Sequence, residues 1–146
     1  MFLQFIVGAI LIIITVLVHA FVLDGLIKFL ERFSPLCRRK FFKHYKVILI
    51  TITVFGVFCA NVVQIWVWAA AFLFLEAEPI QTFEEALYFS TSSFTTAGYG
   101  DLVLSKEWRL MGSFEAANGM ILFGWSTAFI FDVVSKLYKK DDFKAR

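Results

Sequence analysis

The sequence has few charged residues and lacks the residue patterns of the common catalytic sites. Of its 146 residues, 18% are charged and 60% are hydrophobic. A soluble domain of this length does not carry so much apolar surface, which excludes a soluble enzyme or a soluble binding protein. The chain is long enough for one compact unit, and its composition predicts an integral membrane protein.

Cysteine is rare, and the spacings of metal and nucleotide sites are absent. The two cysteines lie apart, Cys37 in a basic stretch and Cys59 inside an apolar run, so neither a disulfide nor a metal site is expected. No catalytic triad, zinc-ligand spacing or phosphate-binding glycine loop is present, and no segment carries the repeated arginines of a voltage sensor. We therefore expect no enzymatic activity, no cofactor and no nucleic-acid partner. The few residues after Tyr138 predict no nucleotide- or calcium-binding domain.

The charges that are present are distributed unevenly. Residues 24–46 carry seven Lys or Arg and two acids, residues 76–107 carry six acids and one Lys, and residues 132–146 carry five Lys or Arg and three acids. Because cytoplasmic segments are rich in Lys and Arg, we expect the C-terminus in the cytoplasm and the N-terminus and the acidic stretch outside a cell membrane. The basic residues also offer a surface for anionic lipid, at Arg38, Arg39, Lys40 and Lys43.

The first apolar run predicts a membrane-spanning helix. Residues 2–23 are almost unbroken in their apolar character, and no basic residue precedes them, which argues against a signal peptide. Residues 24–33 alternate apolar and charged residues at helical spacing, so they either extend this helix or lie flat at the interface. Ser34 and Pro35 are expected to end it. His19 is expected to be partly buried or interfacial, and a role in sensing pH stays open.

Two further runs predict spanning helices, and a shorter helix lies between them. Residues 47–75 and 108–138 are the spans. Within the first of these, Asn61 and Gln64 are expected to bond to neighbouring helices.

The short helix begins at a recognisable capping pattern. Thr82 and Glu85 have the spacing of a capping box, which starts a helix over residues 83–95. This helix is too short to span, so it must be buried in protein or line a water-filled cavity. Its C-terminal end would point at the membrane centre, where the helix dipole favours a cation.

Residues 95–101, which follow the short helix, suit one special backbone. Gly98 and Gly100 can take positive φ without steric cost, and alternating handedness turns successive carbonyl oxygens to one side. The Thr96 hydroxyl can add a further oxygen, and Tyr99 can point away and anchor the segment. Oxygens that replace the hydration shell of a monovalent cation form a selectivity filter.

The sequence Thr-Ala-Gly-Tyr-Gly-Asp of residues 96–101 closely resembles the filter signature of potassium channels, Thr-Val-Gly-Tyr-Gly followed by Asp. A short helix precedes it and a long helix follows it, and the resemblance covers residues 45–138. It implies a homotetramer whose filter carbonyls and Thr96 hydroxyls bind K⁺ as the permeant ion. The implied ion-binding residues are Thr96, Ala97, Gly98, Tyr99 and Gly100.

The chain departs from this family at positions near the filter. Ala97 replaces the usual valine, so selectivity is expected to survive while the rigidity of the filter is in doubt. Tyr88 and Phe89 stand where paired tryptophans are common, and only Tyr88 can form a hydrogen bond. Ser92 stands where some relatives carry a glutamate, so Asp101 lacks that partner. The predicted filter-supporting residues are Tyr88, Ser92, Asp101 and Glu115.

The last helix contains glycines whose spacing resembles that of the family's inner helix. Gly119 and Gly124 are the candidates for a gating hinge, and close packing of helices is the alternative interpretation. If Gly119 is the hinge, Met120, Phe123 and Thr127 follow at helical spacing and should face a water-filled cavity.

Glu115 is an acid in the middle of a predicted span, and such a carboxylate is costly enough to need a partner. Ser92 and Ser93 on the short helix are the expected donors. Two interpretations stay open. Either Glu115 supports the filter from the last helix, or it is a protonated carboxyl bonded between helices.

Together these features predict an all-α membrane protein with three spanning helices, a re-entrant pore helix and a filter loop in each subunit of a tetramer. Residues 1–44 are expected to form an extra N-terminal helix and a basic linker, 45–138 a pore module, and 139–146 a short cytoplasmic tail. The predicted function is a potassium-selective channel. A weakly selective cation channel and a non-conducting regulatory or structural membrane subunit are the alternatives.

Overall fold

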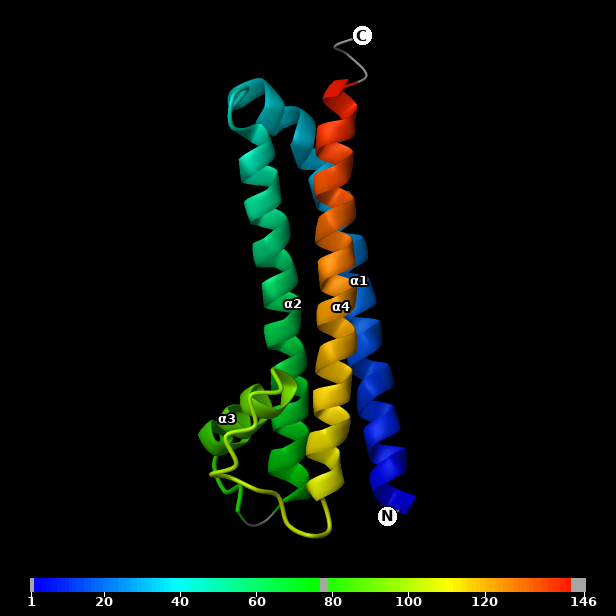
Figure 1. Cartoon of the computed structure of the whole chain (residues 1–146), viewed down its shortest axis with the longest axis vertical. Coiled ribbons are helices and arrows are strands. Elements are labelled where there is room, and N and C mark those ends of the chain that lie inside the picture. Colours follow the sequence, from blue (N-terminus) through cyan, green and yellow to red (C-terminus); the bar gives the residue numbers. More distant parts are fainter. Residues whose placement is uncertain (1, 77–78, 143–146) are drawn as a thin grey trace.

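The computed structural model describes residues 2–76 and 79–142, and the regular structure within these residues is all helical. The helices are α1 (Phe2–Lys40), α2 (Tyr45–Leu75), α3 (Phe83–Phe94) and α4 (Arg109–Asp142). Of these, α1, α2 and α4 are long and apolar enough to cross a membrane. Figure 1 shows these helices side by side, with α3 against one end of α2. The fold is therefore the all-α membrane architecture that the sequence predicts.

The first helix does not end where the sequence indicated. The expected break at Ser34 and Pro35 is wrong, because α1 continues through Pro35 to Lys40. Proline removes one backbone donor, yet tertiary contacts hold the last turns in place: Leu30 and Cys37 are buried against Leu49 of α2. At about 1.5 Å per residue, α1 is long enough to extend well beyond a bilayer core. In Figure 1, α1 passes behind α4, and its last turns reach the N-terminal end of α2.

The short helix α3 begins as the sequence predicted. The Thr82 side chain accepts a hydrogen bond from the backbone of Glu85, and the Glu85 carboxylate accepts one from the backbone of Thr82. This reciprocal capping box fixes the first turn of α3. The other end of α3 is buried at Phe94, inside the apolar core that α2, α3 and α4 share. The large buried side chains of this core are Trp68, Phe72, Phe94, Met111 and Leu122.

Helix α1 packs on α2 and α4 through a face that is partly polar. Gln4, Thr15 and His19 are buried, and Thr15 accepts a hydrogen bond of 2.8 Å from Asn118 of α4. A Cβ at Gly8 would lie 2.6 Å from the Phe114 ring, so α1 and α4 approach closely at this point. These contacts make α1 an integral part of the bundle.

The expectation that Gln64 bonds to a neighbouring helix is confirmed, since its amide lies 2.7 Å from the imidazole of His19 on α1. For Asn61, by contrast, the described residues offer no partner for the side-chain oxygen.

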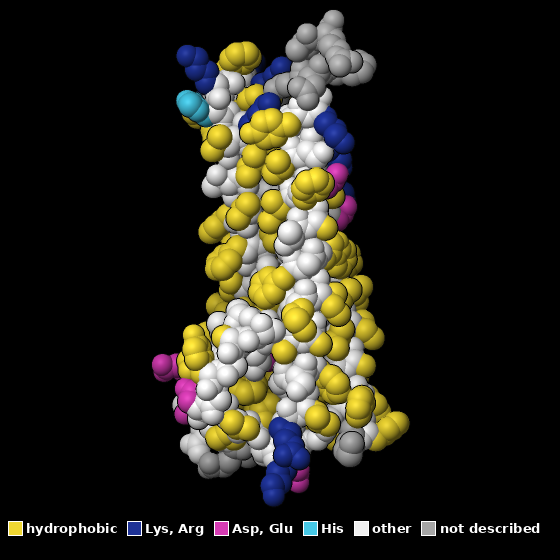
Figure 2. All heavy atoms as spheres, viewed as in Figure 1, with side chains coloured by type: hydrophobic (Ala, Val, Ile, Leu, Met, Phe, Trp, Pro, Cys, Tyr) yellow, Lys and Arg dark blue, Asp and Glu magenta, His cyan; other side chains and the backbone are white. Residues whose placement is uncertain are grey.

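Hydrophobic side chains cover the outside of the bundle, and the charged side chains gather towards its ends. Figure 2 shows apolar side chains along its length, with Lys and Arg at both ends, including the end that contains the α1–α2 turn. The exposed apolar residues include Ile13, Phe21, Phe55 and Phe131. Such a surface is suited to hydrocarbon and not to water.

Candidate ion-binding site

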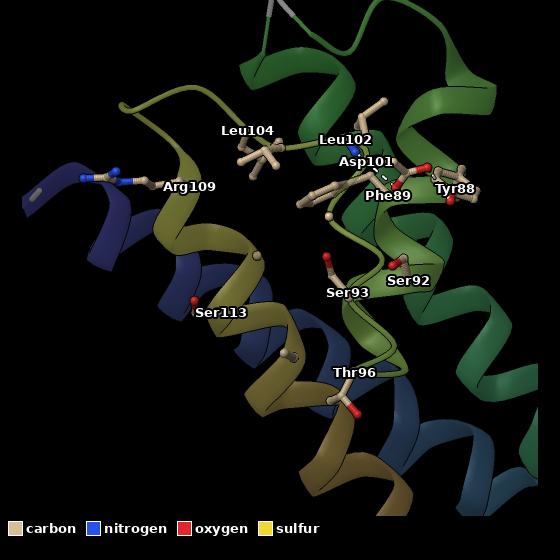
Figure 3. Close-up of a pocket in the computed structure, with 15 residues that line it drawn as sticks. Tyr88, Phe89, Ser92, Ser93, Thr96, Asp101, Leu102, Leu104, Arg109 and Ser113 are labelled. Carbon is tan, nitrogen blue, oxygen red and sulfur yellow. Dashed lines mark hydrogen bonds between the residues drawn. The ribbon is translucent and has the colours of Figure 1, made fainter.

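The candidate site is the segment that follows α3. After Phe94 the chain turns back at Thr96 and runs beside α3 towards Asp101, as Figure 3 shows. The φ angles are positive at Thr96 (60°), Gly98 (57°) and Gly100 (77°), while the φ angles of Ala97 and Tyr99 between them are not. This alternation of handedness is the conformation expected of a backbone that turns its carbonyl oxygens to one side. Residues 95–101 are exposed in the single chain.

Unlike the two glycines of this segment, Thr96 is not a residue type that predicts a left-handed conformation. Threonine is β-branched, and a positive φ at such a residue is a steric outlier that costs about 1–3 kcal/mol. Backbone strain of this kind gathers at functional sites, where the surrounding structure maintains it. Figure 3 places Thr96 at the tip of the segment, with its side chain pointing away from Ser92 and Ser93.

Two residues of α3 hold the part of the segment from Gly98 to Asp101. The Tyr88 hydroxyl donates a hydrogen bond of 2.7 Å to Asp101, and the Asp101 carboxylate raises the pKa of Tyr88 above its ordinary value by accepting that proton. The Ser92 hydroxyl accepts one of 3.3 Å from the backbone of Tyr99, and the Ser92 carbonyl accepts one of 3.2 Å from Gly98. Tyr88, Ser92 and Asp101 thus lie where filter-supporting residues would be required, although their role in conduction stays a prediction.

Glu115 is fully buried, and its partner differs from the expected one. The hydrogen bond to its carboxyl comes from Ser90, not from Ser92 or Ser93. Ser90 faces α4 because Ala86, Ser90 and Phe94 form the buried stripe of α3 at four-residue spacing, whereas Ser92 is turned towards the filter segment. The same spacing in the sequence is the signal that could have identified Ser90.

The Ser90 hydroxyl has two acceptors within reach, the Glu115 carboxyl and the backbone oxygen of Ile65 at 2.8 Å. A serine hydroxyl has one proton and cannot donate to both. Ser90 therefore donates to one of these two acceptors at a time, and both lie within its reach. The geometry thus links α2, α3 and α4 at one point behind the filter segment.

The two candidate hinge glycines have different surroundings. A Cβ at Gly119 would overlap the carbonyl oxygen of Phe94, so glycine is required there by close packing against the end of α3. A Cβ at Gly124 would meet nothing within 4 Å. The structure therefore explains Gly119 by close packing, and a hinge at either position stays a prediction.

The predicted cavity residues lie on the open side of α4. Met120 and Thr127 are exposed in the single chain, and Phe123 packs against Phe94 with ring centroids 5.4 Å apart. On the opposite side of α4, Leu122 and Ser126 are buried. This arrangement leaves the predicted face free for a pore, and its role as the cavity lining stays a prediction.

A cavity of about 350 Å³ separates the filter segment from α4. Figure 3 shows Phe89 and Ser93 of α3, Asp101 of the segment and Ser113 of α4 around it. The hydrogen bonds from Gly98 and Tyr99 hold the filter segment to Ser92 of α3, while α4 lines the other side of this cavity.

A contact that sequence reasoning missed closes the outer end of the site. Glu76 is almost fully buried, and its carboxylate accepts hydrogen bonds from the backbone and the hydroxyl of Ser105. The contact ties the end of α2 to the loop between the filter segment and α4. Nothing in the sequence distinguishes Glu76 from the other acids of the outer stretch, because its partner lies 29 residues away.

A short helix, a following segment that turns back with alternating φ, and two flanking helices long enough to span a membrane define a pore-loop membrane protein. Comparison with known proteins agrees: residues 47–136 match the family described as ion channel, and the chain belongs to that family. The match begins at the start of α2 and ends within α4, so α1 lies outside it. No curated protein and no solved structure matches the chain.

Proposed function

We propose that the chain is a potassium-selective channel, and that K⁺ crosses the membrane passively through it. The observation that supports this most is the alternation of φ from Thr96 to Gly100. It is the backbone form in which a ring of carbonyl oxygens from each residue can replace the water around a bare K⁺ ion. The Thr96 hydroxyl and the carbonyls of Thr96, Ala97, Gly98 and Tyr99 would supply these rings, with K⁺ as cargo and without a cofactor.

We also propose that four copies of the chain form one pore. A single segment cannot surround an ion, and residues 95–101 are exposed in the single chain. Exposed peptide groups are not tolerated in hydrocarbon, so this segment must face other copies or a water-filled path. Closed cyclic symmetry is the usual arrangement for such an assembly.

The proposed location is a cell membrane, with the N-terminus outside and the C-terminus in the cytoplasm. The start of α1 and the filter segment lie at one end of the bundle, and the basic α1–α2 turn and the end of α4 lie at the other (Figure 1). Lys and Arg favour the cytoplasmic side. Arg39, Lys40 and Lys43 are exposed at that end, and with Arg38 they form the proposed contact with anionic lipid.

Ion flux through the purified full chain in liposomes tests the proposal. K⁺ flux should greatly exceed Na⁺ flux, and Gly100→Ala should abolish that preference, because alanine does not readily adopt the φ of 77°. Gly25→Ala is the matched control, since a Cβ at Gly25 meets nothing within 4 Å and lies outside the matched residues.

The same measurement separates the other two functions. Equal K⁺ and Na⁺ flux in the unmodified chain would identify a weakly selective cation channel. The absence of flux for both ions would identify a non-conducting membrane subunit. A normal K⁺ preference in Gly100→Ala would show that this filter geometry is wrong.

A further inference from the structure

His19 is a titratable side chain that the proposed conduction mechanism does not use, and it is fully buried between three helices. Its Nδ1 lies 2.7 Å from Gln64 Nε2 of α2, and its Nε2 lies 3.4 Å from Ser126 Oγ of α4. Its ring centroid lies 5.1 Å from that of Trp125, also on α4. Histidine changes charge between about pH 5 and 8, so a possible proton-binding group connects α1 to the other two long helices.

The hydrogen bonds of this His19 cluster (His19, Gln64, Trp125 and Ser126) correspond to the neutral ring. The Gln64 amide nitrogen is a donor, so Nδ1 accepts, and the single ring proton on Nε2 points to Ser126. The other amide atom, Gln64 Oε1, is buried and has no partner among the described residues. If the ring gains a second proton, Gln64 can turn its amide so that Oε1 accepts from Nδ1–H. The cluster therefore contains an unused acceptor for the protonated ring.

Protonation would change the contacts of His19 with α4. A hydrogen bond from a charged ring is shorter and stronger than a neutral one, and the contact with Ser126 is long at 3.4 Å. A cation beside an indole is attracted to it, which adds to the contact with Trp125. Both changes would draw the inner half of α4 towards α1.

No acid compensates this charge in the described part of the chain. The groups that face His19 are Gln64 from α2 and Trp125 and Ser126 from α4, and α3 does not touch α1. On the same elements Asp24 pairs with Lys28, Asp132 pairs with Lys136, and Glu115 bonds to Ser90. Glu31 is exposed on α1, twelve residues after His19. The free-energy cost of burying the charge therefore opposes the gain in contacts. The balance between the two sets the pH at which His19 takes up the proton.

We propose that His19 is a proton-binding site through which α1 regulates the channel, with acidification raising the open probability. Ser126 is buried on the side of α4 that faces α1, whereas Thr127 and Met120 lie on the open side assigned to the cavity. Movement of α4 towards α1 is therefore movement away from that cavity, which widens it. If His19 binds a proton more tightly when α4 lies close to α1, protonation shifts the population towards that arrangement. This inference rests on the proposed function.

The test is the open probability of the full chain in lipid bilayers between pH 8 and pH 5. It should rise by at least about fivefold, the lower end of the usual coupling between two ligand sites. His19→Gln, which keeps a hydrogen-bonding side chain without a titratable ring, should abolish the rise. Gln64→Glu, which places a carboxylate beside the ring, should move the midpoint of the profile to higher pH.

Two controls separate proton binding from packing. His44→Gln removes the other histidine, which is exposed in the α1–α2 turn, and should leave the profile unchanged. Thr15→Val breaks the contact with Asn118 without removing a titratable group, so it should change open probability equally at every pH. A fall in open probability on acidification, or a rise that persists in His19→Gln, would overturn the proposal.

A second readout does not depend on conduction. A protonated imidazole quenches a neighbouring indole more than a neutral one. The fluorescence of Trp125 should therefore decrease as the pH is lowered in the unmodified chain, and it should stay constant in His19→Gln. Trp125→Phe supplies the background from the other tryptophans. If the chain carries no ion flux but this titration is present, the proposed function fails while the proton site stands. The absence of the titration in a conducting channel overturns the site alone.

Discussion

The outer end of the bundle and the inner half of α4 are held in different ways. Around the filter segment, polar contacts join α3 to the segment, α3 to α4, and the end of α2 to the loop before α4. They are the contacts Tyr88–Asp101, Ser92–Tyr99, Ser90–Glu115 and Ser105–Glu76. Further along α4 the described contacts are mainly apolar, with a hydrogen bond from Ser126 to His19 and the Lys46 ammonium over the Tyr138 ring as the polar ones.

This difference predicts that the filter segment is the more rigid region and the inner half of α4 the more mobile one. Directional hydrogen bonds fix geometry, and a chain with several of them must break each one to move. Apolar helix surfaces can slide on one another without leaving a polar group unpaired. The proposed channel would need a rigid filter and a mobile gate, and this distribution of polar side chains would suit both.

The largest expected effect comes from adding a side-chain atom at Gly119, where α4 lies against the end of α3. Gly119→Ala places a Cβ against the carbonyl of Phe94 and should destabilise the fold by about 3 kcal/mol, the upper part of the range for overpacking. Thermal unfolding of the purified protein measures this loss.

Gly124→Ala is the matched control, because its Cβ meets nothing within 4 Å and alanine favours a helix over glycine by about 1 kcal/mol. Equal stability of the two variants would mean that α4 does not approach α3 as the structure has it.

A smaller effect is expected from the junction behind the filter. Ser90→Ala and Glu115→Gln should each destabilise the protein, and a double-mutant cycle should give a coupling of about 0.5–3 kcal/mol, since both residues share one hydrogen bond. Ser92→Ala combined with Glu115→Gln should be additive, because Ser92 bonds to Tyr99 instead. Strong coupling to Ser92 and none to Ser90 would restore the pairing that the sequence predicted.

The sequence predicted the elements whose signals are local. The apolar runs, the capping box at Thr82 and the glycines of the filter segment each depend on neighbouring residues, and the structure has the corresponding elements. The break at Pro35 was wrong because the packing of Cys37 on α2 overrides a local signal.

The partners of polar residues could not be predicted, because they depend on how helices cross. Glu115 bonds to Ser90, His19 lies between Gln64 and Ser126, and Glu76 reaches Ser105. Each of these pairs joins separate elements, and no spacing within one segment determines them.

A further prediction tests how far the rigidity of the filter depends on its outer end. Tyr88→Phe removes the hydroxyl that donates to Asp101 but keeps the ring beside Tyr99. Selectivity should persist, while the filter should inactivate faster because the Asp101 side chain loses one of its two hydrogen-bond contacts. Single-channel recordings of dwell times measure the change. Unaltered dwell times would show that the other contacts of the segment are sufficient.

The smallest expected effect lies at the start of α3, where Glu85 accepts hydrogen bonds from the backbones of Gln81 and Thr82. These bonds lower the pKa of Glu85 below its ordinary value of 4.5. A carboxylate with a lowered pKa stabilises the folded state above its unfolded pKa, and this contribution is lost as the pH falls through the folded value.

Stability near neutral pH should therefore fall slightly in Glu85→Gln, and the loss of stability below about pH 4.5 should become shallower than in the unmodified chain. Glu84→Gln, one residue earlier and outside the capping box, is the control and should retain the full acid dependence. Thermal unfolding across this pH range measures both variants. An unchanged profile in Glu85→Gln would mean that the cap does not contribute to the acid dependence. The start of α3 would then be held without a contribution from the charge of Glu85, for example through the Thr82 hydroxyl that accepts from the Glu85 backbone.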